Sequence, residues 1–181
     1  MANLRPLTPD DGPAIAALGD QTPETGALAF HSVFHIDPYA ALQTLRPGTA
    51  ELFDICVPRS QIVGHVEFIQ ELEERLRIQL PTYGHAADGN VHTHYMHRIL
   101  EDGVLGGGIS GWRENREAVR KALYDDAINR GGVISGEHGI GEVKRPYLER
   151  NLGSDTLAAM RSIKSALDPK NILNPGKIFD S

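Results

Sequence analysis

Four of the eight histidines in the 181-residue chain fall within the fourteen residues GHAADGNVHTHYMH, positions 84–97. Side chains alternate along an extended segment, so Asn90, His92 and His94 should share one face. His85 precedes the turn-like sequence AADGN and can fold back beside His92. Neutral imidazole is a common zinc ligand, and two or three such nitrogens with a carboxylate also suit manganese or iron. The cluster indicates a metal site, and the alternative is a group of solvated loop histidines.

A second stretch with potential chemistry is ISGEHGIGEVK, residues 134–144. Its glycine spacing is not the G-x-G-x-x-G of a dinucleotide-binding loop, and no G-K-[ST] closes a phosphate loop. Backbone without Cβ atoms lets a planar partner approach closely. Glu137 could complete a His-His-Glu metal site, and the adjacent imidazole of His138 would remain as a base. A glycine-rich turn after a strand is the alternative interpretation.

The elements that must position these residues alternate between strand and helix. Residues 51–58 and 81–96 have the composition of strands. Between them, residues 60–79 place apolar side chains at near-helical intervals. Gly106–Gly108 and Ser110 then indicate a flexible break.

The second half of the chain predicts two more helices. Residues 112–130 form a polar-faced helix, and GVIS, residues 132–135, follows as a third short strand. The last helix covers residues 146–167, with a break at Gly153, and Pro169 prevents its continuation. Together the elements predict an α+β fold, in which helices pack on one face of a small antiparallel sheet.

Composition sets limits on compartment and partners. The net charge of -6 gives no electrostatic reason to expect nucleic acid or an anionic membrane surface as a partner. No window approaches eighteen apolar residues and the N-terminus lacks the pattern of a signal peptide, so we expect a cytoplasmic chain without membrane insertion. Cys56 is the single cysteine, which excludes an intrachain disulfide and a thiolate zinc cage. Its strand-like surroundings predict a small buried side chain rather than a nucleophile.

Residues 1–50 differ in pattern from the rest of the chain. A short strand at residues 3–7, followed by the helix-like sequences TPDDGPAIAALGDQT and DPYAALQTLRPG, resembles the start of acetyltransferases of the GNAT superfamily. The resemblance stops near Ala50, before that family's acetyl-CoA loop, so it implies no acetyl transfer. We therefore divide the chain into an N-terminal appendage, residues 1–50, grafted onto a C-terminal domain, residues 51–181. The apolar side chains of the appendage should pack weakly: Ile15, Leu18 and Leu42.

Three motifs, in order, carry a second and more specific resemblance: GHAADGNVH at 84–92, ISGEHGIGEVKRPYL at 134–148 and IKSALDPKNILNPGKIF at 163–179. Over about residues 51–181 the chain resembles the C-terminal cap domain of flavin-linked 2-hydroxyacid oxidoreductases. That family includes the glycolate oxidase flavoprotein subunit, D-lactate dehydrogenase and D-2-hydroxyglutarate dehydrogenase. The resemblance implies an incomplete, ferredoxin-like α+β cap domain, which closes over an FAD held mainly by a separate domain.

The resemblance also implies roles for individual residues. In this chemistry a 2-hydroxyacid chelates a divalent metal, zinc or manganese, through its carboxylate and hydroxyl, and a base takes the hydroxyl proton while hydride leaves for the flavin. Three protein ligands leave positions open for the substrate, as in catalytic metal sites. The matching residues are His85, His92 and Glu137 as metal ligands, His138 as catalytic base, Asn90 beside the substrate, and Asn174 and Gly139 near the flavin.

Two departures from the family pattern shape the functional prediction. Ala87 stands where the family has glycine, which would strain the loop by about 1 kcal/mol if the position needs φ > 0. The flavin-binding domain has no counterpart here, so we expect the polypeptide to hold a metal without turnover, unless a separate flavin-domain polypeptide joins it. The alternatives are a stand-alone, non-catalytic metal-binding or interaction module and a zinc hydrolase, although H-E-x-x-H is absent.

Overall fold

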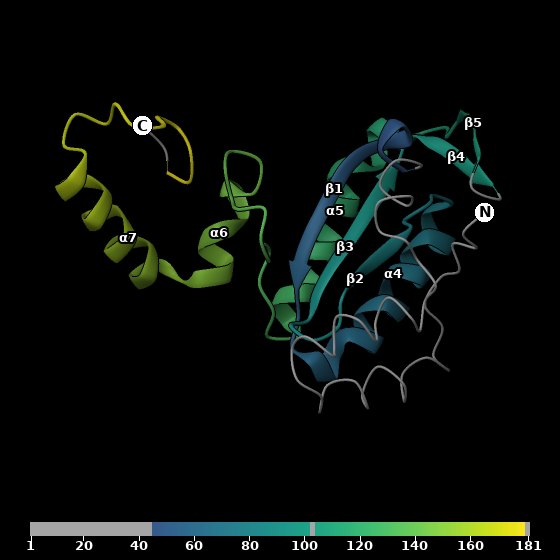
Figure 1. The fold of residues 1–181 in the computed structure, drawn as a ribbon, viewed down its shortest axis with the longest axis horizontal. Helices are drawn as coiled ribbons and strands as arrows, with labels where there is room; N and C mark the ends of the chain where they lie inside the picture. Colours follow the sequence, from purple (N-terminus) through teal and green to yellow (C-terminus); the bar gives the residue numbers. More distant parts are fainter. Residues whose placement is uncertain (1–44, 102–103, 180–181) are drawn as a thin grey trace.

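A computed structural model describes residues 45–101 and 104–179, so residues 1–44 of the GNAT-like start, with Ile15, Leu18 and Leu42, lie outside the described residues. The central unit is a three-stranded antiparallel sheet in the order β1-β3-β2. The strands are β1 (Thr49–Cys56), β2 (Thr82–His85) and β3 (Asn90–Met96). Helices α4 (Ile62–Leu76) and α5 (Trp112–Asn129) cover one face of this sheet (Figure 1). Short 3-10 turns precede β1 at Arg46–Gly48 and α4 at Arg59–Gln61.

Alternation along the strands explains which face the helices cover. In β1, Phe53 and Ile55 are fully buried and pair in register with Thr93 and Val91 of β3. Their side chains point toward the helices and leave the side chains of the alternate residues on the other face. The apolar core between sheet and helices includes Phe53, Ile55, Val91, Tyr95, Ile62, Val66, Ile69, Leu72, Val119, Leu123 and Tyr124. The face away from the helices therefore carries the histidine-rich side of β3.

The predicted third strand at residues 132–135 was wrong in extent. Val133 makes an isolated antiparallel bridge to Cys56 at the edge of β1, and no longer strand follows. Regular pairing ends there because the N–H of Ile134 donates to Oδ1 of Asn151, and the N–H groups of Glu137 and His138 donate to the carboxylate of Asp54. If this bridge is counted as an edge strand, the sheet order becomes Val133-β1-β3-β2, and these strands and the two helices follow one another in the chain as βαββαβ. This is the ferredoxin-like arrangement, and the α+β prediction is confirmed.

The predicted flexible break at Gly106–Gly108 was also wrong. These glycines belong to β5 (Val104–Gly108), which pairs antiparallel with β4 (Arg98–Glu101) in a separate two-stranded sheet. The sequence Asp-Gly between the two strands is the usual signal of a tight hairpin and favours this pairing over a flexible break.

The C-terminal part forms an arm to one side of the sheet and its helices (Figure 1). As expected, the last helix is broken at Gly153, whose φ of 81° interrupts the helical backbone. It therefore consists of α6 (Arg145–Leu152) and α7 (Ser154–Leu167). In the part of the chain that the structure describes, none of the helices has both the length and the apolar content needed to cross a membrane.

Candidate metal centre

The hairpin between β2 and β3 folds His85 back onto His92, as the sequence predicted. Residues His85 and Asn90 pair across the hairpin, and the imidazole rings of His85 and His92 meet edge to face with centroids 5.4 Å apart. Gly89 closes the turn with a φ of 79°, and its N–H donates to the carbonyl of His85. Ala87 has no positive φ, so the strain considered for this position does not arise.

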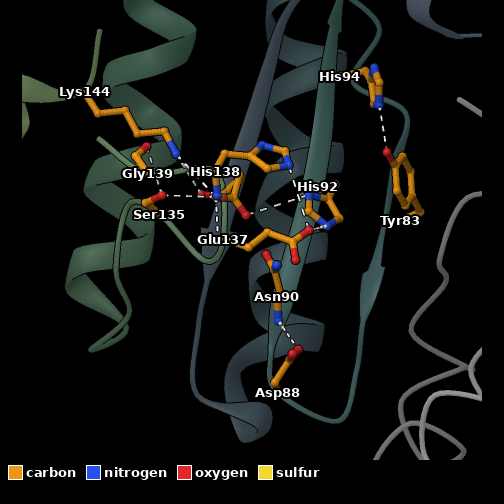
Figure 2. A network of polar contacts seen from close by, with 11 residues as sticks. Tyr83, Asp88, Asn90, His92, His94, Ser135, Glu137, His138, Gly139 and Lys144 are labelled. Carbon is orange, nitrogen blue, oxygen red and sulfur yellow. Dashed lines mark hydrogen bonds and ion pairs between the residues drawn. The ribbon is translucent and has the colours of Figure 1, made fainter. Parts of the chain in front are cut away.

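The glycine-rich loop brings Glu137 and His138 to the same point from the other side of β1. Figure 2 shows both side chains directed toward His92. The carboxylate Oε1 of Glu137 lies 3.3 Å from Nε2 of His92, and the ring of His138 stacks on that of His92 at 5.3 Å. Ligand atoms of His85, His92 and Glu137 all lie within 4.8 Å of one another. Three residues from two distant motifs therefore converge.

Asp54 anchors this loop, and sequence reasoning missed it. Its side chain is fully buried, and its Oδ2 accepts the backbone N–H groups of Glu137 at 2.9 Å and His138 at 2.7 Å. The hydroxyl of Ser135 also lies 3.1 Å from Oδ2. A charged residue in the apolar strand sequence LFDICVP was the available signal, since a carboxylate is rarely buried without partners.

The charge of Asp54 is balanced by Lys144, which is also buried. Its Nζ lies 3.5 Å from Oδ2 of Asp54. Burial by itself raises the pKa of Asp54, but the N–H groups of His138 and Glu137 and the charge of Lys144 outweigh burial and lower the pKa to about 2. Burial also lowers the pKa of Lys144, against the opposing effect of Asp54. The anchor is therefore an ionised carboxylate.

His92 and Asn90 present buried polar atoms that have no partner. Burial lowers the pKa of His92, so its ring is neutral at pH 7, the form that binds metals. Nδ1 of His92, Oδ1 of Asp54 and Oδ1 of Asn90 are buried without a hydrogen bond. The side chain of Asn90 packs against Gly136, where a Cβ atom would come within 2.6 Å of it. These unsatisfied atoms mark a polar site that a ligand would complete.

The two remaining histidines of the cluster have other contacts. His94 lies on the same face as His92, as predicted, but its ring is held between two hydroxyls. One is that of Thr49 at 2.8 Å, and the other, shown in Figure 2, is that of Tyr83 at 3.2 Å. Burial lowers its pKa to about 4. The ring of His97 packs beside Trp112 at 5.4 Å. Both histidines have a structural explanation without a metal.

The two residues predicted near the flavin are exposed. Gly139 has a φ of 79° with open space where a Cβ would stand, and Asn174 has a φ of 48°. The C-terminal motif, residues 163–179, contacts the glycine-rich motif, residues 134–148, because the N–H of Ile178 donates to the carbonyl of Gly141 at 2.7 Å. The fold therefore places the second and third motifs side by side.

The residues at the centre fit a divalent ion by their chemistry. Two imidazoles and one carboxylate form a donor set typical of zinc and also suited to manganese. Atoms that share one ion at about 2.1 Å lie up to about 4.2 Å apart, so the 3.3 Å between His92 and Glu137 is compatible with a common ion. Cys56 takes no part, since its thiol donates to the carbonyl of Asp88 and burial raises its pKa.

Comparison with known proteins gives consistent matches. Residues 37–178 match the family model described as FAD linked oxidases, C-terminal domain. The glycolate oxidase subunit GlcD of Bacillus subtilis is 41% identical over 140 residues, which is 77% of this chain and 28% of that protein. A D-lactate dehydrogenase of Archaeoglobus fulgidus is 46% identical over 134 residues, 74% of this chain and 28% of that protein. The chain therefore spans little more than a quarter of the length of these relatives.

Proposed function

Because the chain belongs to the family of C-terminal domains of FAD-linked oxidases, we propose that it supplies the substrate- and metal-binding part of an FAD-dependent 2-hydroxyacid dehydrogenase or oxidase. The observation that carries the proposal is the convergence of His85, His92 and Glu137 within 4.8 Å. Two imidazoles and a carboxylate would hold a divalent ion, zinc or manganese, and leave positions for a substrate. The relatives' names indicate the substrate class: a small 2-hydroxyacid such as D-lactate or glycolate.

The proposed roles follow from position. The bound ion would orient the substrate and lower the pKa of its hydroxyl group, and FAD would accept the hydride. His138 stands beside Glu137, with its Nε2 3.9 Å from the carboxylate, and its partly exposed ring can receive a proton from a molecule at the centre. The buried Asn90, whose Oδ1 lacks a partner, would bind a polar group of the same substrate.

The match covers 28% of the length of these two relatives. We propose that most of the flavin contacts of the whole enzyme lie in the remaining part of such proteins. Gly139 and Asn174 would border the cofactor at one edge. We further propose that the chain begins with a separate appendage, shorter than the predicted residues 1–50, because β1 already begins at Thr49 and the family match already begins at residue 37. Where those parts are joined, as one polypeptide or as a partner polypeptide, the complete site would carry out the oxidation.

The metal proposal is tested by titrating the purified chain with zinc or manganese in a calorimeter. His92→Ala should abolish saturable binding because it removes the central ligand. His138→Ala should keep it, because His138 is assigned to proton transfer rather than to coordination.

His94→Ala is the matched control. His94 lies on the same strand and the same face as His92, but its ring nitrogens contact Thr49 and Tyr83. This variant should lose stability and retain metal binding. Unchanged affinity in His92→Ala, or loss of binding in all three folded variants, would contradict the proposed ligand set.

A further inference from the structure

We propose that Asp54 is a positioning residue of the metal centre, which holds the Glu137–His138 loop with one carboxylate oxygen and fixes the tautomer of His92 with the other. The inference rests on the proposed function for the metal, while the arrangement of Asp54 is visible without one. Asp54 lies on β1 directly opposite His92 of β3 in the strand register. Both side chains therefore project from the same face of the sheet.

One oxygen of Asp54 fixes the loop. Oδ2 accepts two consecutive backbone N–H groups, of Glu137 and His138, and lies near the Ser135 hydroxyl and the Lys144 ammonium. Because the N–H groups belong to the predicted ligand and base themselves, their Cα positions are tied to β1. A buried carboxylate needs such partners, so loop and anchor stabilise one another.

The other oxygen faces His92. Oδ1 of Asp54 lies 3.8 Å from Nδ1 of His92, and both atoms are buried without any hydrogen bond. The distance is too long for a hydrogen bond, and a shift of about 0.9 Å would make one. Since an ionised carboxylate can only accept, Nδ1 must carry the proton in that bond. Nε2 is then left with the lone pair that a metal needs. The competing acceptor for a proton on Nε2 is the carboxylate of Glu137 at 3.3 Å, which is exposed to solvent, whereas Asp54 is fully buried.

A competing arrangement uses Asp54 as a ligand. Ligand atoms of Asp54, His92 and His138 also lie within 4.8 Å of one another. The loop occupies Oδ2, so only Oδ1 could bind an ion, and Oδ1 faces Nδ1 of His92 rather than Nε2, which points toward Glu137. The two arrangements differ in which nitrogen of His92 carries the lone pair for the metal. It is Nε2 if Asp54 positions His92, and Nδ1 if Asp54 is itself a metal ligand.

The decisive measurement is the tautomer of His92 in the metal-free chain, read from long-range ¹H–¹⁵N NMR spectra at neutral pH. We expect the proton on Nδ1. A proton on Nε2 would overturn the inference, and this result requires neither a variant nor a bound metal. Failure of the wild-type chain to bind metal would overturn the proposed function, while the tautomer still decides the role of Asp54.

Asp54→Asn supplies the second arm. The carboxamide can donate to Nδ1, which shifts the His92 proton to Nε2, and zinc affinity should fall about 10- to 100-fold. Asp126→Asn is the matched control, since Asp126 accepts from another buried imidazole, Nδ1 of His65 at 2.7 Å, between α4 and α5. It should lower stability and leave zinc affinity and the His92 tautomer unchanged. Equal zinc affinity in wild type and a folded Asp54→Asn, or an equal loss in Asp126→Asn, would refute positioning by Asp54.

Discussion

Gly89 and Gly139 have the same backbone conformation in different surroundings. Both have a φ of 79°, a region that L side chains rarely adopt. A Cβ at Gly89 would come within 2.0 Å of the carbonyl oxygen of Val57, whereas a Cβ at Gly139 would meet nothing within 4 Å. The pair separates the cost of the left-handed conformation from the cost of a backbone clash.

We expect Gly139→Ala to lower the free energy of unfolding by about 1 to 2 kcal/mol, the conformational cost alone. Gly89→Ala should cost at least about 2 kcal/mol more, because the hairpin must move away from Val57. Urea unfolding followed by circular dichroism measures both. Equal losses in the two variants would show that the contact with Val57 relaxes easily.

At the residue scale, the sequence was sufficient to predict that His85 and His92 lie together, but not to predict that Asp54 holds the loop beside them. The turn sequence and alternation place His85 beside His92, since both depend on local geometry. Asp54 could not be assigned in the same way, because its partners lie more than eighty residues away. The proposed roles of the site residues remain predictions until metal binding is measured.

At the element scale, charged pairs attach α5 to β1. Glu51 of β1 accepts hydrogen bonds from Arg116 at 2.7 Å and from Arg120 at 2.7 and 2.8 Å. Burial raises the pKa of Glu51, but the two guanidinium groups outweigh burial and lower it below the ordinary value of 4.5. The pair is therefore formed by an ionised, nearly buried carboxylate.

Glu51→Gln should lower the free energy of unfolding by about 2 kcal/mol at neutral pH, because Arg120 loses a charged acceptor. Since the folded-state pKa lies below the unfolded one, the contribution is complete above about pH 4.5 and is lost as pH falls through the folded value. The stability difference between wild type and variant should therefore shrink in acid, as measured by urea unfolding across pH.

Glu117→Gln is the control, because Glu117 also pairs with Arg120 but is exposed. It should change stability by less than about 0.5 kcal/mol. A pH-independent difference for Glu51→Gln would mean that packing, rather than charge, joins the two elements.

Periodicity predicted the helices of the sandwich well, because their apolar faces are continuous. The two errors concern strands. The β4-β5 hairpin contains three consecutive glycines, which have no side chains to show alternation. The segment 132–135 has strand composition, but only Val133 bridges β1, since the N–H of Ile134 donates to Asn151 and the following N–H groups of Glu137 and His138 donate to the carboxylate of Asp54. Both errors reflect tertiary context that a local pattern does not contain.

At the scale of the whole molecule, the C-terminal arm presents apolar side chains to solvent. Leu167 is 79% exposed and Ile172 is 71% exposed. No residue of α7 belongs to the apolar core of the sheet and its helices, among the residues described. The two residues proposed to border the flavin, Gly139 and Asn174, are exposed in or beside this arm. We therefore expect the described part of the chain to contact a cofactor from one side only.

The 181-residue polypeptide should therefore purify without flavin. Tight small-molecule sites bury most of the ligand surface. Contact with this chain from one side would bury too little of the isoalloxazine ring of FAD and would leave its diphosphate unbound. The measurement is the visible absorption spectrum after gel filtration, combined with metal analysis of the same sample. We expect a colourless protein that binds zinc or manganese when either is supplied. A stoichiometric flavin spectrum that survives gel filtration would show that these residues hold the cofactor by themselves, and would move the proposed flavin site into this chain.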